Sequence, residues 1–202
     1  MKPKIIIIGA GSHANSCVDV IELEKKYSIY GLIDEKKPRS IILKKYKYLG
    51  RDKDLKKIRK TIKYAIICVG FIHDFNLRNK IYLNLKKLKF KIPNIISPIS
   101  YVSKKSKIGF GTMIFHEALI NSNVTIGNNS IINTKSLIEH DVKIGNNCHI
   151  STGVIVNGNS KIGDNTFIGS GSVISNNVKI GKNCFIKMKS RVIKNVPNNT
   201  KI

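Results

Sequence analysis

An aliphatic residue recurs at every sixth position through the second half of the chain. The sixteen members are Val102, Ile108, Ile114, Ile120, Ile126, Ile132, Ile138, Ile144, Ile150, Val156, Ile162, Ile168, Ile174, Ile180, Ile186 and Val192. A small or β-branched residue stands four positions after each of them, and Gly, Asn and Asp crowd the positions between. An uninterrupted series of this length restricts the region to one architecture, a β-solenoid built from hexapeptide repeats.

The repeat also predicts how each position packs. The aliphatic side chain fills the core, the small residue fits an interior corner, and Gly, Asn or Asp accept the positive φ of a tight turn. Cys148 and Cys184 both occupy the small position, two coils apart if three hexads make one coil. Because coils stack about 4.8 Å apart, two coils separate the cysteines by roughly 10 Å, which is beyond disulfide reach. We expect both thiols to be core residues.

The first half of the chain has a different pattern. An apolar run over 4–8 predicts a buried parallel strand, and a helix is expected from the glycines that follow it to about Lys26. Further strands are expected at 29–33, 64–69 and 92–96, with helices at 52–60 and 74–89. This alternation predicts a small parallel α/β sheet. We therefore expect two domains, an α/β domain at 1–96 and the solenoid at 97–202.

Charge and cysteine content restrict the partners. The chain has 36 Lys+Arg against 12 Asp+Glu, a net charge of +24, but it lacks Trp and has no basic run interleaved with aromatic residues. Nucleic-acid binding is therefore not expected, although a basic nucleic-acid binder is the reading that charge alone would favour. The four cysteines form no C-x-x-C pair, so no metal site is expected, and no apolar run is long enough for a signal peptide or membrane span. We expect a reduced, cytoplasmic protein.

A glycine loop follows the first strand. Gly9, Gly11 and Ala14 match the G-x-G-x-x-A fingerprint of dinucleotide sites, and Asp34 stands at the end of the next strand. Such glycines let the backbone approach a pyrophosphate at a helix N-terminus, and the acid accepts a ribose hydroxyl. The residues before the solenoid suffice for only one mononucleotide-binding half, which favours a nucleotide sugar over NAD. A purely structural tight turn is the remaining alternative.

Further residues sharpen this pattern. His13 stands inside the glycine loop, the third strand ends in Cys68-Val69-Gly70, Arg78 follows in a helix, and Pro98 leads into the first coil. With the hexads, this arrangement resembles the hexapeptide-repeat acyltransferases that act as sialic-acid O-acetyltransferases or as N-acetyltransferases of bacillosamine-type UDP-amino sugars. The resemblance covers nearly the whole chain. It implies a Rossmann-like N-terminal domain and a left-handed parallel β-helix, the hand being supplied by the resemblance alone.

The resemblance also assigns a substrate site. In the family, the N-terminal domain holds the nucleotide of a nucleotide-linked sugar. Carried over, the glycine-loop residues would meet phosphate or sugar and the acid the nucleoside; these substrate-binding residues are Gly9, Gly11, Ser12, His13 and Asp34. For His13 the alternative is a histidine that only caps the helix.

A second motif is Glu139-His140-Asp141. The hexad register places His140 and Asp141 at a turn, where a histidine is usually just solvated. The triplet is similar to the catalytic motif of the family, which implies that His140 is the general base and Asp141 orients its ring. An imidazole suits this role because it can accept a proton near neutral pH.

His149 lies half a coil beyond His140 and resembles a second family histidine that contacts the acetyl group. Half a coil separates a corner from the opposite face, so the two rings can share a site only if a neighbouring chain supplies one. The resemblance implies a homotrimer with sites between adjacent subunits, and this spacing is what such sharing requires. Gly158 and Asn159, one coil after His140 and Asp141, would lie beside the thioester of acetyl-CoA, where a backbone amide could receive the oxyanion.

The expected function is acetyl-CoA-dependent N-acetylation of a nucleotide-linked amino sugar in surface-glycan biosynthesis, without a metal. Sialic-acid-type O-acetylation is an alternative, because one histidine base serves either nucleophile. The chain departs from the family at its end, where Lys187-Met188-Lys189 and the final residues 197–202 replace the usual glycines and Gly-x-Pro-Ala loop. This departure motivates a further alternative, a non-catalytic trimer that binds sugar nucleotides. The sequence does not select the sugar, the nucleotide or the pathway.

Overall fold

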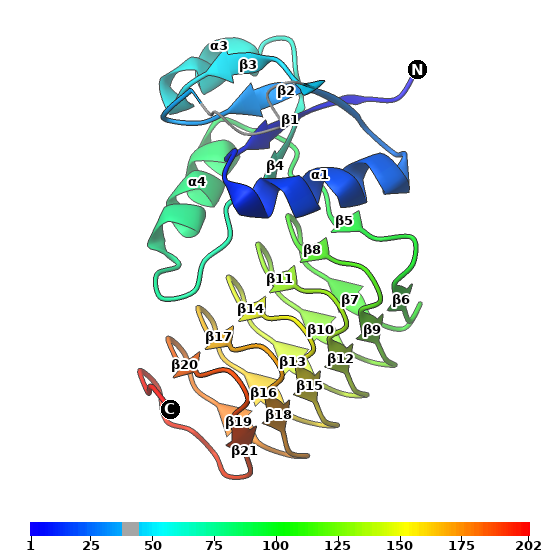
Figure 1. Cartoon of the computed structure of the whole chain (residues 1–202), viewed down its shortest axis with the longest axis vertical. Coiled ribbons are helices and arrows are strands. Elements are labelled where there is room, and N and C mark those ends of the chain that lie inside the picture. The colour runs from blue at the N-terminus through cyan, green and yellow to red at the C-terminus, as the bar shows by residue number, and fades with distance from the viewer. Residues whose placement is uncertain (38–44) are drawn as a thin grey trace.

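The computed structural model describes residues 1–37 and 45–202 and shows an α/β layer stacked on one end of a long triangular β-helix (Figure 1). The α/β layer has a four-stranded parallel sheet of order β3-β2-β1-β4. Its strands are β1 (Lys4–Ile8), β2 (Ser28–Ile33), β3 (Tyr48–Gly50) and β4 (Tyr64–Ile67). Its helical segments are α1 (Ser12–Glu24), the 3₁₀ turn η1 (Asp52–Asp54), α3 (Leu55–Ile58) and α4 (Asn76–Lys87).

The β-helix consists of two-residue strands that repeat every six residues and stack into three parallel sheets. One sheet contains β5 (Ile95–Ile96), β8 (Met113–Ile114), β11 (Ile131–Ile132), β14 (His149–Ile150), β17 (Phe167–Ile168) and β20 (Phe185–Ile186). The second contains β6 (Tyr101–Val102), β9 (Leu119–Ile120), β12 (Leu137–Ile138), β15 (Ile155–Val156), β18 (Val173–Ile174) and β21 (Arg191–Val192). The third contains β7 (Lys107–Ile108), β10 (Thr125–Ile126), β13 (Lys143–Ile144), β16 (Lys161–Ile162) and β19 (Lys179–Ile180).

The core of the β-helix follows the hexad pattern. The second residue of each strand is the predicted aliphatic one, and these residues form one cluster together with the small corner residues. Cys148 and Cys184 are free thiols within that cluster, which confirms that they are core residues.

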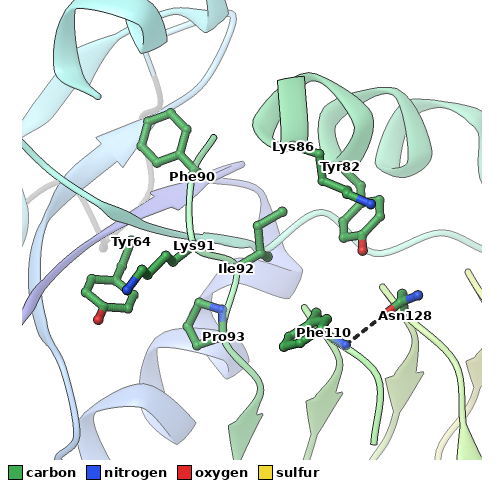
Figure 2. A pocket seen from close by; sticks show the side chains of 9 residues that line it. All are labelled: Tyr64, Tyr82, Lys86, Phe90, Lys91, Ile92, Pro93, Phe110 and Asn128. Atoms are coloured by element: carbon green, nitrogen blue, oxygen red, sulfur yellow. Dashed lines mark hydrogen bonds between the residues drawn. The ribbon is translucent and has the colours of Figure 1, made fainter. Parts of the chain in front are cut away.

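The segment 92–96 was expected to be a strand of the α/β sheet, and that prediction was wrong. Only Ile95–Ile96 forms a strand, β5, and it pairs with β8 of the β-helix. The reason is register: Ile96 stands six residues before Val102, so it continues the hexad series by one step. The linker over Phe90–Pro93 passes between α4 and the first coils (Figure 2).

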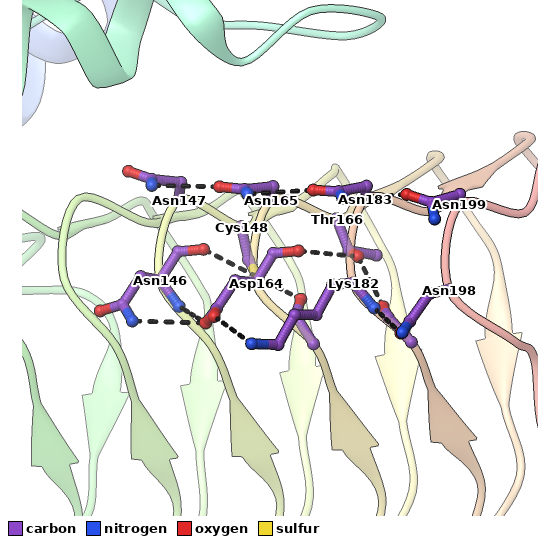
Figure 3. A network of polar contacts seen from close by, with 12 residues as sticks. Asn146, Asn147, Cys148, Asp164, Asn165, Thr166, Lys182, Asn183, Asn198 and Asn199 are labelled. Carbon is purple, nitrogen blue, oxygen red and sulfur yellow. Dashed lines mark hydrogen bonds and ion pairs between the residues drawn. The ribbon is translucent and has the colours of Figure 1, made fainter.

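Asparagine occupies the turns for a structural reason. Asn147, Asn165, Asn183 and Asn199 have φ between 53° and 61°, a region that Asn enters more readily than most residues. Their side chains form a ladder in which each Nδ2 donates to the Oδ1 of the next coil at 2.9–3.1 Å (Figure 3). Asp164 lies between Asn146 and Lys182 in the neighbouring column of the same figure. The turns therefore keep adjacent coils in register.

The two domains share a core and a buried arginine. α1 lies between the sheet and the first coils, and Cys17 packs in one cluster with Met113 and Phe115 (Figure 1). Arg78 of α4 is 1% exposed and donates to Ile67 O and Val69 O of the α/β domain, at 2.9 and 2.7 Å. It also donates to Asn129 O of the β-helix at 3.1 Å. These bonds fix the loop after β4 against the coils.

Candidate active site

The glycine loop is shaped by close backbone contacts. Gly9 has φ +95°, and a Cβ there would collide with Val69, so only glycine fits without rearrangement. The Gly9 N–H donates to Ile33 O at 2.8 Å, and the Ala10 N–H donates to Asp34 Oδ2 at 2.8 Å. Asp34 therefore holds the loop through one carboxylate oxygen. Gly11 is the N-cap of α1, whose first turn contains no acidic residue.

A cavity of about 550 Å³ opens over this loop. It is lined by Gly9, Gly11, Ser12, His13, Asp34, Cys68, Val69, Gly70, Phe71, Ile72, Leu77 and His149. The structure thus brings together all five residues predicted to bind the substrate, and it adds His149 from the β-helix. Cys68–Ile72 and Leu77 were not assigned to the site from sequence, although the end of a parallel strand is where such loops meet ligands.

His149 is buried within its own chain. It is 6% exposed, its Nδ1 donates to Phe71 O at 2.6 Å, and its ring contacts the edges of Phe71 and Phe167. Burial lowers the pKa of His149 to about 4, so the ring is neutral at pH 7 with its lone pair on Nε2. The ring centroids of His13 and His149 are 6.4 Å apart. Neither ring has a hydrogen-bond partner for its Nε2 within the described part of the chain.

This pKa predicts acid sensitivity. Unfolded His149 binds a proton below pH 6.5, whereas the folded side chain does so only near pH 4, so stability falls as the pH drops through that window. The loss should be on the order of 3 kcal/mol. His149→Phe should remove this pH-dependent loss of stability, because Phe has no group that titrates. A Phe also fits the aromatic column formed with Phe167 and Phe185. Urea unfolding of both proteins at pH 7 and pH 4.5 measures the difference; equal losses in the two proteins would contradict this prediction.

His140 has the opposite environment. It lies in the turn between β12 and β13 with 58% of its side chain exposed, and its Nδ1 is 2.9 Å from Asp141 Oδ2. Hydrogen bonds from His140 and then Asn123 lower the pKa of Asp141, so the carboxylate is charged at neutral pH. Because the charged Asp141 carboxylate can only accept a hydrogen bond, the neutral form of the ring carries its proton on Nδ1. The lone pair of that form is then on Nε2. Asp141 has φ +62°, the turn geometry that directs its carboxylate to the ring.

Gly158 lies against this imidazole. A Cβ at Gly158 would be 2.8 Å from both Cε1 and Nε2 of His140. The Asn159 N–H donates to His140 O at 3.0 Å and is therefore already occupied. Gly158 is buried, and its N–H has no acceptor among the residues that the structure describes.

The contact with Gly158 gives a second prediction. If His140 is the base that the sequence predicts, Gly158→Ala should lower kcat about tenfold or more, because the added methyl group displaces the imidazole. The double variant Gly158→Ala/His140→Ala is the matched control, because the methyl group then has no ring to displace. Steady-state kinetics of the four proteins measures the coupling. The same fractional loss in both backgrounds would show that Gly158 acts independently of His140.

Within one chain the two histidine sites are separate. His149 lies on β14, under the α/β domain, whereas His140 lies in a turn that joins the other two sheets. Two further histidines lie outside both sites. His116 Nδ1 is 2.7 Å from Ser97 Oγ and its Nε2 is 2.8 Å from Asp19 Oδ2, so this ring links the β-helix and α1. His73 is exposed but stacks on Phe185.

Across residues 1–37 and 45–202 there is no group of three or more His, Cys, Asp or Glu side chains arranged to hold a metal ion. No described helix is both long and apolar enough to cross a membrane.

Comparison with known families matches both halves of the chain. Residues 4–85 match the PglD N-terminal domain. Residues 119–157 match the hexapeptide repeat of succinyl-transferase, and residues 159–194 match the bacterial transferase hexapeptide with its six repeats. The chain thus contains a PglD N-terminal domain followed by hexapeptide repeats. No curated protein matches the chain.

Several solved structures share this fold over almost the whole chain. A variant of perosamine N-acetyltransferase from Caulobacter crescentus, in complex with CoA and GDP-perosamine, has 23% identity and a TM-score of 0.92, covering 98% of this chain and 92% of that one. The acetyltransferase domain of PglB from Neisseria gonorrhoeae FA1090, in complex with acetyl coenzyme A, has 22% identity and a TM-score of 0.92, covering 100% and 96%. WeeI from Acinetobacter baumannii AYE has 23% identity and a TM-score of 0.85, covering 99% and 96%.

These likenesses establish the fold of the chain. They confirm the predicted class, a Rossmann-like α/β domain followed by a left-handed parallel β-helix.

Proposed function

We propose that this protein is an acetyl-CoA-dependent N-acetyltransferase that acts on a nucleotide-linked amino sugar. The observation that carries the proposal is the pairing of two sites: a cavity built on a glycine loop and His149, and an exposed His140–Asp141 dyad with a free imidazole lone pair. The structural neighbours support the substrate class, since one of them is a complex with CoA and GDP-perosamine and another a complex with acetyl coenzyme A.

The cavity suits a nucleotide sugar. The N-terminus of α1 has no side-chain cap and no acid in its first turn, so its amides near Gly11 and Ser12 are available to a diphosphate. Asp34 uses Oδ2 to hold the loop and Oδ1 to accept the Lys36 N–H at 3.2 Å, and these acceptor oxygens lie where a ribose hydroxyl would bind. The unpartnered Nε2 atoms of His13 and His149 would meet polar atoms of the sugar or of the acetyl group.

The reaction requires no covalent enzyme intermediate. The amine nitrogen attacks the acetyl carbonyl carbon of the thioester, His140 Nε2 takes the amine proton, and the C–S bond breaks. The departing CoA thiolate then receives that proton, which gives the N-acetyl sugar and free CoA thiol. Asp141 would stabilise the imidazolium through Nδ1, and the Gly158 N–H, which has no partner among the described residues, would donate to the oxyanion.

The two halves of this site would come from different subunits. The imidazole of His140 faces away from the core at a β-helix corner, whereas the cavity lies under the α/β domain of the same chain. In a homotrimer, the corner of one subunit would complete the cavity of its neighbour. Cyclic symmetry would make the three sites identical.

A panel of nucleotide sugars tests the proposal. UDP-, GDP- and CMP-linked amino sugars, their hydroxyl analogues and free sialic acid are incubated with acetyl-CoA, and release of free thiol is followed. We expect release with at least one nucleotide-linked amino sugar and little with the hydroxyl analogues or sialic acid. Transfer only to a hydroxyl would make the protein an O-acetyltransferase. Binding of nucleotide sugars without binding of acetyl-CoA at millimolar concentration would make it a non-catalytic trimer.

A further inference from the structure

A second cavity lies at the other end of β4 from the glycine-loop cavity. Figure 2 shows the residues that line it. It has a volume of about 680 Å³, within the range of small-molecule sites. Tyr64, at the amino end of β4, lines it, whereas Cys68–Gly70, after the carboxyl end of β4, line the first cavity. The two sets of lining residues have no member in common, so the second cavity is a separate site.

The lining combines aromatic rings with positive charge. Four rings and two ammonium groups come from the strand, helix α4, the linker and the β-helix: Tyr64, Tyr82, Phe90, Phe110, Lys86 and Lys91. No carboxylate is among the lining residues. A mostly apolar cavity with a few charged groups of one sign is typical of a site for a small ligand of the opposite charge.

Phe110 departs from the repeat. In the next coils the same turn position holds Asn128, Asn146 and Asp164, and each side-chain oxygen accepts the backbone N–H of its counterpart one coil earlier at 2.8 Å. Phe110 is the first member of this column, and its ring is 72% exposed beside the cavity. As the first member, Phe110 has no earlier residue of the column to bind, so a polar side chain is not needed there; its exposed ring leaves apolar area in water. A stacking ligand would cover that area.

The two lysines are free to meet an anion. Lys86 Nζ lies 5.8 Å from the ring centroid of Tyr82, and Lys91 Nζ lies 5.8 Å from that of Tyr64. Neither lysine is in an ion pair with any residue of the described ranges. The net charge of +24 would also draw anions toward the protein.

We propose that this cavity is a second ligand site and that it binds a small aromatic anion of the nucleotide class. The base stacks on Phe110, and the phosphate lies against one of the two lysines, which stand on opposite sides of Ile92 (Figure 2). The proposal does not depend on acetyl transfer, because no residue of the dyad or of the glycine loop lines this cavity.

AMP is the probe for this site, with adenosine and inorganic phosphate as separate probes for the base and the anion. Isothermal titration at low salt should show AMP binding more tightly than either part. Phe110→Asn restores the residue type of the column, and it should weaken AMP binding about tenfold or more through loss of stacking. Lys86→Met/Lys91→Met should do the same. Lys56→Met/Lys57→Met on α3 removes the same charge outside the cavity and should leave binding unchanged.

Three results would overturn the proposal. The first is no AMP binding at millimolar concentration by protein whose melting temperature shows it to be folded. The second is AMP binding that survives Phe110→Asn but is lost with Asp34→Ala, which would place AMP in the glycine-loop cavity. The third is equal loss in both lysine pairs, which would show a general charge effect. Thiol release from acetyl-CoA should be unchanged in Phe110→Asn, so failure here is distinguishable from failure of the proposed function.

Discussion

His140→Ala should lower the turnover number by roughly 10²–10⁴-fold, because the variant lacks the group that takes the amine proton. His140 is exposed and lines neither cavity, so its loss should leave the fold and the binding of nucleotide sugar unchanged. Stopped assays of thiol release give the rate, and titration with the nucleotide sugar gives the affinity.

Asp141→Asn is the companion variant. It keeps the size of the side chain but removes the charge that stabilises the imidazolium, so its turnover should fall less than that of His140→Ala. The pH profile should change as well, since the lowered pKa of Asp141 shows that the carboxylate interacts with the ring. Turnover of His140→Ala within a few-fold of the unmodified protein would exclude His140 as the base.

The β-helix could be predicted from sequence because its repeat is local and redundant. Each hexad states the same pattern, so the core position of Ile138 or Ile174 follows from counting. The repeat begins one hexad earlier than expected, at Ile96 in β5. A short apolar run there could equally belong to the α/β sheet, so the sequence did not show to which domain it belongs. In contrast, β3 is three residues long and has no periodicity to read, so it was not expected.

The glycine-loop site could be predicted because its residues are near in sequence and follow a strand. The place of His149 in that cavity could not, since it depends on how the α/β domain packs on the β-helix. That packing is set by contacts between distant residues, such as Arg78 with Asn129 O and α1 with Phe115. The sequence likewise does not predict which amide of the Gly158–Asn159 pair is hydrogen-bonded. In the structure the Asn159 N–H donates to His140 O, and the Gly158 N–H has no acceptor among the described residues.

The proposed division of the site between subunits predicts rescue of activity in mixed oligomers. One parent carries His140→Ala and lacks the base; the other carries His13→Ala/His149→Phe and has a disabled cavity. Each parent alone should be nearly inactive. Two chains co-expressed in equal amounts should regain about a quarter of the unmodified activity, since each site then needs an intact corner from one chain and an intact cavity from the next.

The value of one quarter separates this arrangement from a site within one chain. If the corner and the cavity of the same chain formed the site, every chain of the mixture would carry a defect, and activity would stay at the level of the parents. Distinct affinity tags on the two chains isolate the mixed oligomers, in which one site of three is intact, so their activity should be about a third of the unmodified level against about a quarter for the whole mixture. Light scattering reports the number of subunits. Mixed oligomers as inactive as either parent, or a fully active monomer, would contradict the shared site. Recovery near one quarter requires that a His140 from one chain reach the cavity of another.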